Sequence, residues 1–127
     1  MYDIIFYEDK NGYSEVVSLL SVMEKDGRTN KQSRINFDKI VAYIDKLKLS
    51  GTRVGKPITK HLDGEIWELR PLKNRILYAY YDNNRFIILT HFVKKTQKTP
   101  KREIDRAKRY LKDYKERKME NVNMGRG

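Results

Sequence analysis

Residues 61–102 hold the pattern that most constrains the fold of this chain. Three segments rich in aromatic and β-branched residues, 65–70, 75–81 and 85–94, are separated by the polar turns 71–74 and 82–84. The second turn favours a tight reversal, because Asn83 and Asn84 tolerate positive φ. Strands joined by tight turns run antiparallel. The stretch therefore predicts a three-stranded meander.

The segments around this meander predict one more strand and three helices. Residues 2–7 are typical of a strand, whose position in the sheet the pattern leaves open. Apolar residues recur at helical spacing in 16–23 and 37–47, with Thr29 or Asn30 as the cap of the second helix. Residues 52–64 are expected to form a loop. Thr99 and Pro100 are expected to begin the last helix.

The resulting order is strand, helix, helix, strand, strand, strand, helix, which predicts an α+β fold. A helical hairpin should cover one face of a small, four-stranded, antiparallel-dominated sheet and leave a basic groove on the other. The 127 residues suffice for one domain, expected to span 1–118. Residues 119–127 are polar with two glycines, and we expect them to form a disordered tail.

The charge is concentrated near the C-terminus. The chain carries a formal net charge of +11, and residues 94–118 hold 12 Lys and Arg against 4 Asp and Glu, a difference of +8. Such a field favours polyanions as partners. There is no cysteine, which excludes disulfides and is compatible with a cytoplasmic location. No apolar run is long enough to span a membrane.

Several catalytic classes lack their residues in this sequence. There is no Gly-rich phosphate loop, no nucleophile elbow and no acidic cluster for Mg²⁺, which argues against nucleotide-dependent enzymes and two-metal nucleases. The two histidines, His61 and His91, have no metal-ligand spacing. We therefore predict neither a metal nor a cofactor.

Strand alternation predicts which side chains share a face of the sheet. Trp67 and Leu69 suit the core beneath the helices, which places Glu68 and Arg70 on the other face. A sheet that gathers its cations on that face would suit a phosphate backbone. The expected members are Arg70, Arg75, His91 and Lys95.

Simpler interpretations exist for each of these residues. Arg70 and Glu68 could form only a surface ion pair, contributing under about 1 kcal/mol. Lys94 and Lys95 could protect a sheet edge, and His91 could be a partly buried structural histidine. The basic last helix could be a solvated face, although its charge favours contact with a polyanion.

Three motifs in order resemble the RelE/ParE toxin superfamily, and most closely its HigB toxins of the phage-derived type. These motifs are Glu68-Leu69-Arg70, Arg75-Ile76-Leu77-Tyr78, and the segment 92–100, FVKKTQKTP, which leads into a helix. The preceding strand and two helices agree with the layout of that superfamily. The resemblance covers nearly the whole chain, up to about Lys118.

The resemblance implies a toxin of a type II toxin–antitoxin pair that cleaves mRNA, typically on the ribosome. It implies a HigA-type helix-turn-helix antitoxin, whose complex with the toxin binds promoter DNA. By position, Arg70, Arg75 and Lys95 match the cationic catalytic residues. The expected RNA-binding residues are Lys60, Lys73, Lys94 and Lys98.

Metal-free RNA cleavage needs a base at the 2′-OH, positive charge at the phosphate and an acid at the leaving 5′-oxygen. Arg70 and Arg75 suit the electrostatic role. Lys95 is the candidate acid or base, and Glu68 and His91 are alternative bases. Three other functions stay open: a ParE-like gyrase inhibitor, against which the FVKK segment argues, a non-catalytic nucleic-acid-binding module, and an inactive toxin kept as a binding partner.

Overall fold

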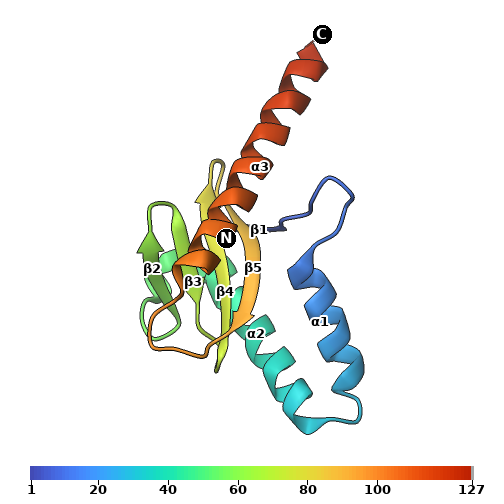
Figure 1. Ribbon diagram of the computed structural model, residues 1–127, viewed down its shortest axis with the longest axis vertical. Helices are drawn as coiled ribbons and strands as arrows, with labels where there is room; N and C mark the ends of the chain where they lie inside the picture. Colours follow the sequence, from blue (N-terminus) through green and yellow to red (C-terminus); the bar gives the residue numbers. More distant parts are fainter. Residues whose placement is uncertain (127) are drawn as a thin grey trace.

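The computed structural model describes residues 1–126, with side chains described for residues 1–119. Figure 1 shows the elements, which follow one another along the chain as β1 (Asp3–Phe6), α1 (Glu15–Asp26), α2 (Lys31–Ser50), the short 3-10 helix η1 (Gly51–Val54), β2 (Thr59–Asp63), β3 (Ile66–Leu69), β4 (Asn74–Tyr81), β5 (Arg85–Val93) and α3 (Lys101–Arg126). The predicted α+β class and the predicted elements are confirmed, and β2 and η1 are added to them.

The sheet has five strands in the order β1-β5-β4-β3-β2. The strands β2 to β5 are antiparallel, and β1 lies parallel to β5 at one edge. The prediction of four strands was wrong because β2 lies within the segment expected to be a loop. Its sequence, TKHLD, carries little apolar pattern, since β2 is an edge strand that pairs only with β3.

Both faces of the sheet are covered by helices. On one face, α1 and α2 contribute Val16, Ile40 and Leu47 to a core that includes Leu69 and Ile76. On the other face, α3 contributes buried side chains to a second core, made of Tyr7, Ile66, Leu77, Ala79, Ile87, Leu89, Ala107 and Leu111. The expected helical hairpin is present, but the opposite face is not open. The narrow apolar stripe of α3 covers most of it.

The last helix crosses the sheet and then extends beyond it (Figure 1). The Tyr7 hydroxyl in the segment after β1 donates a hydrogen bond of 2.7 Å to Asp113 Oδ2, which ties α3 to the sheet. The helix continues to Arg126, through residues 119–126 for which the sequence predicts disorder; Gly127 lies outside the described residues. Within residues 1–126, no helix is both long enough and apolar enough to cross a membrane.

Candidate functional site

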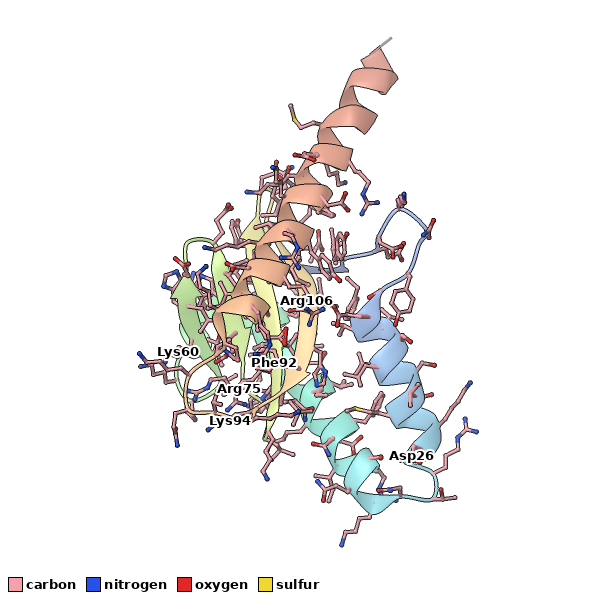
Figure 2. The ribbon with its side chains drawn as sticks, in the orientation of Figure 1. Asp26, Lys60, Arg75, Phe92, Lys94 and Arg106 are labelled. Carbon is pink, nitrogen blue, oxygen red and sulfur yellow. The ribbon has the colours of Figure 1, made fainter. Side chains whose placement is uncertain are left out.

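A groove of about 740 Å³ lies where the loop from β5 to α3 crosses the end of the sheet. Figure 2 shows Lys60, Arg75 and Lys94 around this end, and we call the hollow the basic groove. Seven of its lining residues are Lys or Arg, and two are acidic, Glu68 and Glu103. The cations are Lys60, Arg70, Arg75, Lys94, Lys95, Lys98 and Arg102. The groove therefore attracts anions.

The register of the strands explains why these residues meet. Glu68 on β3 is paired with Lys60 on β2 and with Leu77 on β4, so the three side chains share the face covered by α3. Arg75 is two residues before Leu77 and shares that face. Because α3 begins only at Lys101, the loop 94–100 and the first turn of α3 line the groove at this end of the sheet.

Glu68 is the centre of the groove floor, with only 2% of its surface exposed. Its Oε1 lies 3.6 Å from Arg70 Nε and 3.9 Å from Arg75 Nε. Its Oε2 accepts a hydrogen bond from the Thr99 hydroxyl, just before α3. A buried carboxylate is stable only when it is paired. Glu68 therefore joins two guanidinium groups to the start of the last helix.

Backbone carbonyls at the turn before β4 bind the side chain of Arg75. Its Nη1 donates to Leu72 O at 2.9 Å and to Asn74 O at 2.8 Å. Burial lowers the pKa of Arg75 from its usual value, partly offset by Glu68; a guanidinium remains charged. Leu72 adopts φ of 59°, an uncommon conformation for leucine. The turn thus holds Arg75 at the cost of local backbone strain.

The exposed lysines form the rim of the basic groove. Lys95 and Lys98 project from the loop that follows β5, and Lys60 comes from β2. Lys94 lies in the same loop, and its backbone N–H donates to Lys73 O at 2.7 Å. Lys73 itself is not part of the lining. The structure therefore brings together all of the predicted RNA-binding lysines except Lys73.

His91 is not part of the basic groove, which corrects the expectation that it joins Arg70, Arg75 and Lys95. It is paired with Ile76, whereas Arg75 is paired with Phe92, so His91 faces the side of α2. Strand alternation alone could not choose between these faces, because the choice depends on the register. His91 Nε2 contacts Asn74 Oδ1 at 2.9 Å. Burial and the nearby Arg106 lower the pKa of His91 to about 4.

Sequence reasoning missed two residues that shape the groove, Thr99 and Glu103. Thr99 was expected only to begin a helix, yet its hydroxyl bonds Glu68. Glu103 pairs with Arg106, whose Nη1 also pairs with Glu15 at the start of α1. The contacts of Thr99 with Glu68 and of Arg106 with Glu15 join residues far apart in the chain, so no local pattern predicts them. The pair Glu103 and Arg106 is local, three residues apart on α3.

The other histidine, His61, is also among the lining residues. Its Nε2 contacts Gly64 O at 2.8 Å, and its ring lies edge-on to Trp67 at 5.1 Å. The imidazole is thus engaged within the β2–β3 hairpin. Among the side chains described, no group of three His, Asp or Glu is placed to bind a metal ion.

The geometry suits the binding of a phosphodiester. Two guanidinium groups share one buried counter-charge, and lysines surround them at the rim. Guanidinium groups can bind phosphate through two parallel hydrogen bonds. Arg70 Nε is buried without a hydrogen-bond partner and lies 3.6 Å from Glu68 Oε1.

Comparison with known proteins places the sequence in a family. Residues 28–112, more than half of the chain, match the phage-derived protein Gp49-like family. Among solved structures, the YoeB-YefM complex from Staphylococcus aureus contains a similar chain, with 16% identity and a TM-score of 0.47. That match covers 75% of this chain and 99% of the other. No curated protein matches the sequence.

The matched residues include α2, the whole meander, the basic groove and residues 101–112 of α3. They therefore contain Arg70, Arg75 and the segment 92–100, the motifs on which the resemblance was based. The chain belongs to the phage-derived Gp49-like family, a family of RelE/HigB-type toxins.

Proposed function

We propose that the protein is a metal-independent endoribonuclease that cleaves mRNA on the ribosome and thereby arrests translation. The single observation that carries this proposal is the pair Arg70 and Arg75 around the buried Glu68, at the floor of a groove lined by seven cations. The Lys and Arg side chains along this groove would neutralise the phosphate charges of a bound RNA strand.

The proposed reaction is an internal transfer within the RNA. The ribose 2′-OH loses its proton to a base, and its oxygen forms a bond to the adjacent phosphorus. The bond from phosphorus to the 5′-oxygen then breaks, and that oxygen receives a proton from an acid. The products are a 2′,3′-cyclic phosphate and a 5′-OH end.

In this mechanism Arg70 and Arg75 stabilise the negative charge that develops on the phosphorane. Glu68 orients the two guanidinium groups, since both of its oxygens are already engaged. Lys95 is exposed at the rim and is the group we assign to proton transfer. His91 has no part in proton transfer, because it faces α2.

The proposal includes a partner protein. Membership in a toxin family supports an antitoxin, for which we propose the HigA type, a helix-turn-helix protein whose complex with the toxin binds promoter DNA. Co-expression with the neighbouring open reading frame should restore growth and yield a co-purifying complex. Growth that stays arrested, with no complex, would contradict this part of the proposal.

Cleavage is tested with purified protein, first on free RNA in EDTA and then on mRNA in translating ribosomes, which need Mg²⁺. The ends of the products identify the chemistry, because internal transfer leaves 5′-OH and 2′,3′-cyclic phosphate ends. Arg75→Ala should lose cleavage, and Arg53→Ala, at an exposed arginine on η1, should retain it. Product ends that carry 5′-phosphate, or cleavage unaffected by Arg75→Ala, would overturn the mechanism.

Two alternatives predict different outcomes in the same assay. A gyrase inhibitor would leave RNA intact and would inhibit supercoiling by purified gyrase. A non-catalytic binding module would bind RNA with a steep dependence on salt and would give no product.

A further inference from the structure

A chain of three polar side chains runs from α2 to the turn beneath the basic groove. Asn74 at the start of β4 has 4% of its surface exposed. Its Nδ2 donates to Asn36 Oδ1 on α2 at 2.9 Å. Its Oδ1 lies 2.9 Å from His91 Nε2 on β5. Asn36, Asn74 and His91 thus link three elements, and we call them the amide relay.

The direction of every hydrogen bond in the amide relay is fixed by backbone carbonyls. Asn36 Nδ2 donates to Gln32 O at 3.0 Å, so Asn36 Oδ1 is the acceptor for Asn74. Asn74 Nδ2 also donates to Pro71 O at 3.3 Å, which leaves Asn74 Oδ1 to accept from His91. His91 must therefore carry its proton on Nε2, because an amide oxygen cannot donate.

The amide relay ends at the turn that holds Arg75. The backbone N–H of Asn74 donates to Pro71 O at 3.0 Å and closes the turn. The carbonyls of Leu72 and Asn74 then bind Arg75 Nη1 on the opposite face of the sheet. Because Leu72 has φ of 59°, the turn needs support to keep this conformation. The side chain of Asn74 provides that support from the face of α2.

We propose that Asn36, Asn74 and His91 are positioning residues, which fix the guanidinium of Arg75 for the phosphate. Asn74 is the central one, because it alone touches the turn, α2 and β5. The geometric claim stands on the contacts of Arg75, and the predicted effect on rate rests on the proposed ribonuclease function. The two claims can therefore fail separately.

The geometric claim is tested without any cleavage assay. The side-chain NMR signals of Arg75 are assigned by their loss in Arg75→Lys. In the wild-type protein the two ends of the guanidinium should exchange slowly, because Nη1 is held by two carbonyls. In Asn74→Ala the two ends of the guanidinium should exchange quickly, so that their signals merge. Asn11→Ala, at an exposed loop asparagine, should leave the signals separate. Unchanged Arg75 signals in a folded Asn74→Ala protein would overturn the proposal.

The claim about rate is tested by a double-mutant cycle. Asn74→Ala should lower kcat by about tenfold to 10²-fold and leave KM within about twofold, because misplaced groups lose transition-state contacts first. In an Arg75→Ala background, Asn74→Ala should have no further effect, since the group that it positions is gone. If the losses in kcat caused by the two substitutions multiply in the double mutant, Asn74 acts independently of Arg75, and the proposal is overturned.

A conservative substitution separates positioning from general destabilisation. His91→Gln can place an amide donor near the position of Nε2, whereas His91→Leu cannot. The glutamine variant should retain most of the rate and the slow exchange of Arg75, and the leucine variant should lose both. If His91→Gln and His91→Leu have the same melting temperature and lose the rate and the slow exchange equally, His91 has no positioning role. If the wild-type protein cleaves no RNA, the proposed function fails, and the NMR comparison still decides this inference.

Discussion

The carboxylate of Glu68 lies 3.9 Å from Nε of Arg75, and both residues are almost fully buried, with 2% and 6% of their surfaces exposed. Burying two charges is costly, and mutual attraction offsets this cost only when the remaining polar atoms are also satisfied. Thr99 and Arg70 complete the shell of Glu68, and two carbonyls complete that of Arg75. Glu68, Arg70 and Arg75 together thus leave a net charge of +1 at the floor of the basic groove.

The first prediction concerns that charge. Arg75→Ala should lower the rate of RNA cleavage by about 10² or more, because a group that stabilises the developing phosphorane is lost. Arg75→Lys should recover only part of the rate, since an ammonium cannot make the two parallel bonds of a guanidinium. Single-turnover cleavage of a defined RNA measures both. Full activity of a folded Arg75→Lys protein would refute the requirement for a guanidinium.

The second prediction concerns Glu68. Glu68→Gln should lower the free energy of unfolding by about 3 kcal/mol, because two buried or half-buried guanidinium groups lose their counter-charge. Glu24→Gln, at an exposed position on α1, should change it by less than about 0.5 kcal/mol. Denaturant titration measures both. Equal stabilities of the two variants would show that Glu68 does not hold the arginines.

The third prediction concerns the lysines at the rim. Binding of a single-stranded RNA with a 2′-deoxy residue at the cleavage point should weaken steeply as salt rises. Lys60→Ala and Lys98→Ala should each reduce the slope of log K against log salt by about 0.7, the value for one phosphate contact. Lys31→Ala, exposed on α2 and outside the groove, should leave the slope unchanged. A slope equally affected by all three would place the RNA elsewhere.

The fourth prediction concerns pH and His91, whose pKa in the folded protein is about 4. An unfolded histidine has a pKa of about 6.5. Below about pH 6.5 the unfolded chain takes up a proton that the folded protein does not bind, so stability falls as the pH drops toward 4. The loss should reach about 3 kcal/mol.

His91→Gln should remove this pH dependence. The two proteins should be similar in stability above about pH 7, and the variant should become the more stable one, by up to about 3 kcal/mol, as the pH falls to 4. Denaturant titrations at several pH values measure it. A difference that stays constant from pH 4 to 7 would mean that His91 titrates normally in the folded protein. A second consequence concerns the pH profile of cleavage. Because the pKa of His91 is about 4, its titration should not change the cleavage rate between pH 5 and 8.

Much of the fold follows from local patterns in the sequence. The meander is predictable because Asn83 and Asn84 adopt φ of 53° and 67°, as such turn residues can. The start of α2 is predictable because Asn30 Oδ1 accepts from Ser33 N at 3.0 Å, as an N-cap does. β2 was missed because an edge strand needs no alternating apolar residues.

The candidate site was predictable only in part. Arg70, Arg75, Glu68 and Lys95 were identified through strand alternation and family motifs, and they meet in the groove. The position of His91 depends on a register that includes an irregularity between Leu77 and Tyr78, which no local signal marks. The roles of Thr99 and Asn74 depend on contacts that exist only once the sheet and helices have packed.

The central claim is tested most directly by mapping mRNA 5′ ends in cells during growth arrest by the expressed protein, with Arg75→Ala as the matched variant. The account predicts new 5′ ends inside translated reading frames, absent with Arg75→Ala and suppressed by co-expression of the proposed antitoxin. Arrest with intact mRNA would contradict it, and an accompanying DNA-damage response would indicate gyrase as the target.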